Sequence, residues 1–165
     1  MAIYPSKEWV IEVLKAAERS EIYKEAAKDW EGDFLCKIEA DEEFISDMGR
    51  KETVAGYISF LDMMPIEERK KYRGTPMGDV LEKKLGLPLD ASMNDLDVDE
   101  ISSRMSKLSA DDIRGSAVYF WIDFWHGSIR NMVPVAPGEH GDATFRLAGR
   151  YGNWKLLVSR QQEAN

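Results

Sequence analysis

The sequence contains only one cysteine, Cys36, and only two histidines, His126 and His140, among its 165 residues. A single cysteine excludes an internal disulfide and any metal site built from several cysteines. The motifs GxGxxG, GxxxxGK[ST], GxSxG and HExxH are also absent. The chain therefore lacks the common signatures of dinucleotide-binding, P-loop, serine hydrolase and zinc peptidase sites.

Long apolar runs are lacking too. No run approaches the roughly 20 residues needed to cross a bilayer, and residues 1–15 carry charges where a signal peptide would have its apolar centre. We therefore expect a cytoplasmic protein without a transmembrane segment.

Basic residues are in the minority, with 22 Lys and Arg against 30 Asp and Glu and a formal net charge of −8. A field of that sign repels phosphate backbones, so we expect no nucleic-acid partner. The one basic run, residues 69–73, directly follows Glu67 and Glu68, which is typical of a solvated helix face.

What is present is a globular composition, with 44% hydrophobic and 32% charged residues. The length predicts a single domain over residues 1–165. Ser6 is a suitable N-cap for a first helix, and Ser20 starts a second helix that Gly32 closes. From Asp33 the apolar period changes to two, which predicts a strand.

The middle of the chain predicts a loop over residues 40–52 and a second strand over Val54–Leu61, with Gly56 as a possible bulge. Residues 62–114 then have a different character and predict a helical insertion between strands. Within it, Thr75-Pro76 starts a short helix, and Asp97 with Glu100 forms a capping box for another.

The β pattern resumes over residues 116–130, with Gly127 as a bulge or turn. A turn over residues 136–141, a strand over 143–148, a loop over 149–152 and a final helix from Asn153 follow. The predicted class is α+β, with a mostly antiparallel sheet of about four to five strands, helices packed on one face, and a helical insertion at about 62–114.

Residues 119–125, with the sequence YFWIDFW, form the most distinctive segment. In a strand, Val118, Phe120, Ile122 and Phe124 lie on one face, and Tyr119, Trp121, Asp123 and Trp125 on the other. One interpretation is a central strand covered on both sides, with the insertion as the second cover. The other is that one face lines an apolar ligand cavity.

Candidate catalytic groups are few. Asp123 and His126 are three residues apart, which places them on opposite faces of a strand unless a bulge intervenes. His140 lies in a predicted exposed turn, and Cys36 on an apolar strand face predicts a buried thiol. Asp123, His126, Glu139 and His140 lack a recognised metal-ligand spacing. We predict no catalytic residue, metal or cofactor.

Four blocks resemble, in the same order, the prokaryotic sterol-carrier-type (sterol carrier protein 2-like) lipid-binding proteins. The blocks are residues 4–9 (YPSKEW), 23–34 (YKEAAKDWEGDF), 120–127 (FWIDFWHG) and 148–155 (AGRYGNWK). Together they cover about half of the chain.

The resemblance implies a sheet with helices on one face and an apolar tunnel between them, which binds fatty acids, acyl conjugates or sterol-like lipids without chemistry or cofactor. Each methylene buried in such a tunnel gains roughly 0.8 kcal/mol. The expected tunnel walls are Phe34, Cys36, Phe120, Ile122, Phe124 and Phe145 from the strands, with Trp9, Val13 and Trp30 from the helices.

The chain departs from this family in two respects. The insertion is longer than the connection expected there, and the family usually continues with another strand and helix after the helix of Trp154. One hypothesis is that apolar residues of the insertion replace the missing cover: Met77, Leu81, Leu85, Ile101, Met105 and Leu108. A second subunit is the alternative cover.

Two further functions stay open. An uncovered sheet edge and aromatic face favour association, so the chain is alternatively a protein-interaction or homo-oligomerisation module that keeps the fold without a functional tunnel. An enzyme that uses His126 with Asp123 is the more distant third.

Overall fold

The computed structural model describes residues 3–164, and the side chains of residues 3–159. Its centre is a four-stranded sheet of order β3-β2-β1-β4, formed by β1 (Glu31–Glu39), β2 (Ala117–Trp125), β3 (Ser128–Val135) and β4 (Phe145–Arg150). β2 pairs antiparallel with both β1 and β3, while β4 runs parallel to β1. The predicted α+β class with a mostly antiparallel sheet is confirmed.

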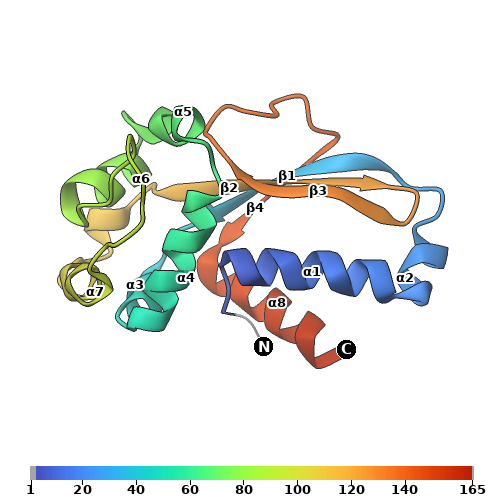
Figure 1. Ribbon diagram of the computed structural model, residues 1–165, viewed down its shortest axis with the longest axis horizontal. Helices are drawn as coiled ribbons and strands as arrows, with labels where there is room; N and C mark the ends of the chain where they lie inside the picture. Colours follow the sequence, from blue (N-terminus) through green and yellow to red (C-terminus); the bar gives the residue numbers. More distant parts are fainter. Residues whose placement is uncertain (1–2, 165) are drawn as a thin grey trace.

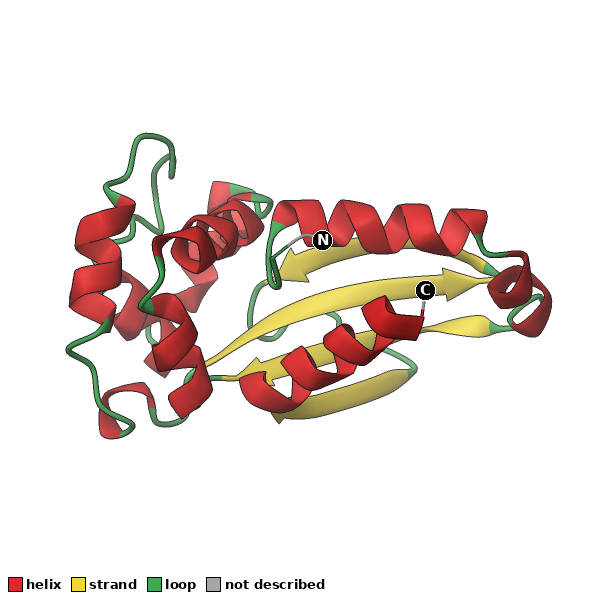
Figure 2. Cartoon of the chain, turned by 90° about the horizontal axis from the view of Figure 1, so that it is seen from below, coloured by secondary structure: helices red, strands yellow, loops and turns green. Residues whose placement is uncertain are grey.

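Two long helices lie on one face of the sheet (Figures 1 and 2). α1 (Lys7–Arg19) packs against β3 and α4 (Lys51–Asp62), and α8 (Tyr151–Ala164) packs against β1 and β4. The short α2 (Glu21–Ala26) follows α1. The predicted caps are present, because the Ser6 and Ser20 hydroxyls accept hydrogen bonds from the backbone N–H of Trp9 and Tyr23, the third residue of each helix.

Helical turns fill the connection from β1 to β2, at one end of the sheet (Figure 2). The α-helices are α3 (Glu42–Met48), α4 (Lys51–Asp62), α5 (Ile66–Arg69), α6 (Pro76–Asp79) and α7 (Val98–Met105); η1 (Lys70–Tyr72) and η3 (Asp111–Ile113) are 3₁₀-helices and η2 (Val80–Lys84) is a π-helix. The Thr75 and Asp97 side chains cap α6 and α7 as predicted.

The predicted second strand is wrong. Residues 54–61 belong to α4, in which Val54, Tyr57, Ile58 and Leu61 recur at helical spacing and are buried. Gly56 is therefore not a bulge; a Cβ there would lie 3.1 Å from the Pro5 carbonyl oxygen, so it allows the N-terminal segment to approach α4 closely. The predicted loop over residues 40–52 contains α3, and the helical segment starts at Glu42 rather than at Asp62.

Three boundaries also differ from the prediction. α2 ends at Ala26, so Trp30 lies outside the helix and Gly32 lies within β1. The strand predicted over 116–130 is a hairpin, with its turn at His126 and Gly127, where both residues have positive φ. The predicted loop at 149–152 is absent from the described chain, because β4 ends at Arg150 and α8 begins at Tyr151.

From the sequence, the face of the sheet opposite α1 and α8 is open to two interpretations, and in one of them the helical insertion is its cover. The connection over residues 136–144 lies over this face (Figure 1), and of the described β2 residues on it only Tyr119, at one end, packs against the core to which the helical segment contributes. His140 stacks on Trp121 with ring centroids 4.2 Å apart, so it is half-buried and not exposed as predicted. The Asp33 carboxylate accepts hydrogen bonds from Thr144 and from Trp121 Nε1, which fixes this connection to β1.

The hydrophobic residues of the helical segment are part of the main hydrophobic core. All six residues proposed as a replacement cover belong to, or pack against, one continuous buried cluster that extends to the sheet: Met77, Leu81, Leu85, Ile101, Met105 and Leu108. Arg69, predicted on a solvated basic face, is buried and donates to the Ala91 carbonyl oxygen. The Tyr72 hydroxyl joins the segment to β2 and β3, through Tyr119 N–H and the Val135 carbonyl oxygen.

Candidate functional site

The strand register brings the predicted apolar residues onto one face. Phe34 lies opposite Ile122 on β2 and Phe145 on β4, and Cys36 lies opposite Phe120. Phe124 is opposite Gly32 on the same face. Because paired residues project to the same side of a sheet, the six predicted strand residues form one apolar row that faces α1 and α8.

The row has a closed half, in which side chains fill the space between sheet and helices. Cys36, Phe120 and Trp9 are buried there. The Trp9 ring meets Phe120 edge-on at a centroid distance of 6.0 Å, and Trp154 from α8 meets it at 5.6 Å. Trp154 Nε1 donates to the Lys37 carbonyl oxygen at 2.9 Å, which holds α8 on β1.

The other half is open and aromatic. Phe34 lies at centroid distances of 5.0 Å from Phe145, 5.4 Å from Phe124 and 6.1 Å from Trp30, and Trp30 lies 5.3 Å from Phe145. These four rings are called the aromatic cluster below. Trp30 and Phe145 are 39% and 40% exposed, and Leu147, next along the same face of β4, is 45% exposed.

Ile122 lies between Phe120 and Phe124 on β2 and so joins the two halves, and Val13 is the expected wall residue that follows Trp9 by one turn of α1. Both are half-buried and pack against the core. The row is therefore continuous from the buried thiol of Cys36 to the exposed rings of the aromatic cluster. Along β1 the distance from Phe34 to Cys36 is about 7 Å, at roughly 3.3 Å per residue.

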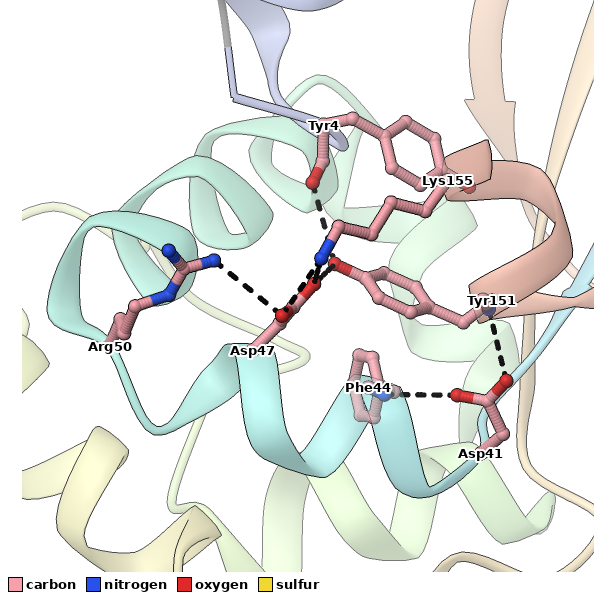
Figure 3. A network of polar contacts seen from close by, with 8 residues as sticks. Tyr4, Asp41, Phe44, Asp47, Arg50, Tyr151 and Lys155 are labelled. Atoms are coloured by element: carbon pink, nitrogen blue, oxygen red, sulfur yellow. Dashed lines mark hydrogen bonds and ion pairs between the residues drawn. The ribbon is translucent and has the colours of Figure 1, made fainter. Parts of the chain in front are cut away.

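A polar network fixes the start of α8, which forms one side of the row (Figure 3). The buried Asp47 carboxylate on α3 accepts a hydrogen bond from the Tyr151 hydroxyl at 2.9 Å. It also forms an ion pair with Lys155 Nζ at 2.8 Å. Burial and the neighbouring Asp47 raise the pKa of Tyr151 above its usual value. Arg50 Nη2 lies 3.5 Å from the same carboxylate.

Asp41 adds a second link between α3 and α8. One oxygen of its carboxylate accepts the backbone N–H of Phe44, as the N-cap of α3, and the other accepts the N–H of Gly152 at 3.0 Å. One carboxylate thus satisfies orphan N–H groups at the starts of two helices.

Two hollows in the described part of the chain differ from the expected apolar tunnel. An open cleft of about 700 Å³ beside the ends of β1 and β4 has mixed charged walls that include Lys37, Glu39, Glu43, Arg114 and Arg150. A cavity of about 10 Å³ lies between Ile38, Phe44, Tyr57 and Tyr151, which is at the lower limit for one water molecule.

The histidine and cysteine side chains are engaged or buried. His126 Nε2 lies 2.7 Å from Glu31 Oε1, whereas Asp123 binds Arg130 Nε at 2.9 Å, so Asp123 and His126 have different partners. Burial raises the pKa of the Cys36 thiol to about 12. Among residues 3–159 no group of three or more His, Cys, Asp or Glu side chains is arranged to hold a metal ion.

Residues that the sequence analysis missed are Tyr4, Asp47, Tyr151 and Lys155. Asp47 lies in an acidic stretch that predicts a loop, and its main partner is distant in sequence, so no local pattern marks it. None of the helices over residues 3–164 is long and apolar enough to cross a membrane. The chain matches no family model, no curated protein and no solved structure.

Proposed function

We propose that this chain binds and carries a hydrophobic ligand — a fatty acid, an acyl conjugate or a sterol-like lipid — along the apolar row between the sheet, α1 and α8. The observation that carries the proposal is the aromatic cluster. Four rings, each in contact with at least one other, lie at the open end of a continuous apolar row, and two of them are about 40% exposed. Exposed apolar surface of this kind on a monomer typically marks a binding site.

The ligand would enter at the aromatic cluster and extend toward Cys36. Side chains fill the inner half of the row, so entry requires α1 and α8 to move apart there. α1 packs mainly on β3 and α4, and α8 mainly on β1, β4 and α3. Each helix therefore has its own support, and the sheet need not be disrupted when the space between them widens.

Phe145 offers a direct test, with Trp125 as its matched control. Both are exposed aromatic residues on strands, at 40% and 38%, but Trp125 lies on the opposite face of the sheet. Covering about 60–80 Å² of the Phe145 ring contributes roughly 1.5–2 kcal/mol, or about tenfold to thirtyfold in affinity. Phe145→Gln should weaken binding of dodecan-1-ol by that factor, as measured by calorimetric titration, and Trp125→Gln should not. Equal effects of the two variants, or no binding by the wild type, would refute the proposal.

Self-association is the second candidate function, and one observation favours it. β4 is an edge strand of the sheet, and Phe145 and Leu147 on it are exposed. Such an edge is a template for pairing with a second copy of the chain. This function predicts a stable dimer without bound lipid. Phe145→Gln would then shift the sedimentation equilibrium toward the monomer.

A further inference from the structure

The hydroxyl of Tyr4 is a buried polar group at the inner end of the apolar row. Tyr4 is 8% exposed, and its hydroxyl oxygen has no hydrogen-bond partner among the described residues. The ring meets Trp9 edge-on at a centroid distance of 4.9 Å and lies 5.7 Å from Tyr151. Tyr4 thus lies between a residue of α1 and a residue of α8.

The contact with Trp9 places Tyr4 beside the closed half of the row, because the Trp9 ring also meets Phe120. Burial, then the proximity of Cys36 and Asp41, raise the pKa of Tyr4 well above its usual value. Cys36 is the innermost of the predicted wall residues on β1. Figure 3 shows the Tyr4 side chain directed away from Asp47, whose carboxylate oxygens are already occupied by Tyr151 and Lys155.

A buried hydroxyl without a partner destabilises a folded protein, because it loses its hydrogen bonds to water and gains none. The packing of the ring against Trp9 and Tyr151 does not need the oxygen, and phenylalanine would make the same ring contacts. A hydroxyl that no other described group of the protein satisfies, beside the closed half of an apolar row, is explained if the row binds a ligand with a polar end.

We propose that the Tyr4 hydroxyl donates a hydrogen bond to the inner end of the bound ligand, and that this end is an uncharged oxygen group, a hydroxyl or an ester carbonyl, rather than a free carboxylate. This inference rests on the proposed function and narrows its ligand class. A carboxylate buried there would need a cation. The neighbouring Lys155 ammonium is paired with Asp47, and the Asp41 charge disfavours a second anion.

The test compares dodecan-1-ol with dodecanoate, two probes with the same chain length that differ in the charge of the polar end. Calorimetric titration at pH 7.5 should give an affinity for the alcohol at least tenfold higher than for the acid. Tyr4→Phe should weaken alcohol binding by about 5- to 10-fold, the loss expected for one hydrogen bond, and change dodecanoate binding less than twofold.

Tyr57→Phe is the matched control. Tyr57 is also buried, but its hydroxyl donates to Met77 Sδ at 3.8 Å and lies among the helices rather than on the row. It should leave both affinities unchanged. Thermal unfolding of the ligand-free proteins gives a second readout, because Tyr4→Phe should leave the melting temperature unchanged or raise it.

The outcomes separate the two proposals. If neither probe binds the wild type, the proposed function fails and this inference fails with it. If both probes bind, and Tyr4→Phe weakens both equally or neither, the proposed function stands and the role of Tyr4 is overturned. Tighter binding of dodecanoate than of dodecan-1-ol also overturns it.

Discussion

Replacing Asp47 with alanine should loosen the attachment of α8 to the rest of the fold. The buried carboxylate accepts a hydrogen bond from the Tyr151 hydroxyl at 2.9 Å, and a hydrogen bond to a charged group contributes about 1.5–3 kcal/mol. Lys155 is 41% exposed and can return to water, so its ion pair adds no more than about 1 kcal/mol. The expected loss is about 1.5–4 kcal/mol of unfolding free energy.

Urea unfolding followed by circular dichroism measures this loss directly. For a chain of this size, each kcal/mol also lowers the melting temperature by about 2–4 °C. Arg50→Ala is the control, because its guanidinium lies 3.5 Å from the same carboxylate but is 65% exposed. That variant should lose less than about 0.5 kcal/mol. If Asp47→Ala were no less stable than Arg50→Ala, the reasoning about this network would be refuted.

Three other predictions concern the sheet, the core and the helical segment. The hydrogen bond from the backbone N–H of Thr144 lowers the pKa of the Asp33 carboxyl. The hydrogen bonds of the ionised carboxylate therefore stabilise the fold above about pH 4, and this contribution is lost as the pH falls through the lowered pKa. Asp33→Asn should remove that part of the loss of stability in acid, and an unchanged dependence of the unfolding free energy on pH would contradict this prediction. Cys36, buried and with its pKa raised to about 12, should react with Ellman's reagent at pH 8 only after denaturation; rapid labelling of the native protein would contradict its placement. Gly78→Ala should lower the unfolding free energy by about 3 kcal/mol or more, because a Cβ there would lie 1.9 Å from the Tyr72 carbonyl oxygen. An unfolding free energy equal to that of the wild type would contradict this prediction and show that the backbone there moves at little cost.

Elements defined by local signals were predicted correctly from the sequence. Side-chain caps at Ser6, Ser20, Thr75 and Asp97 act within three residues, so their residue types suffice to place helix starts. The strict alternation in residues 118–124 gave the faces of β2 correctly, because the side-chain period of a strand is independent of its partners.

Elements that depend on tertiary packing were not predicted. The α4 sequence is apolar on several sides, so both a strand and a helix fit Val54–Leu61; burial against the N-terminal segment and α7 decides for the helix. The two halves of the apolar row could not be distinguished either. Cys36 is covered and Phe145 exposed because of the way the helices pack across the sheet, which no local pattern encodes.

The polar groups of the site were the hardest to foresee. Tyr4 and Asp47 acquire their roles from Tyr151, which is more than one hundred residues away in the sequence. A tyrosine near the N-terminus and an aspartate in an acidic stretch have no unusual local context. Only the assembled fold brings them together.

Native mass spectrometry of the purified protein, before and after incubation with dodecan-1-ol, tests the central claim most directly. A carrier of a hydrophobic ligand predicts a monomer that gains the mass of one lipid per chain, with the adduct reduced in Phe145→Gln and retained in Trp125→Gln. A dimer that takes up no lipid under the same conditions would contradict the carrier function and favour association through β4.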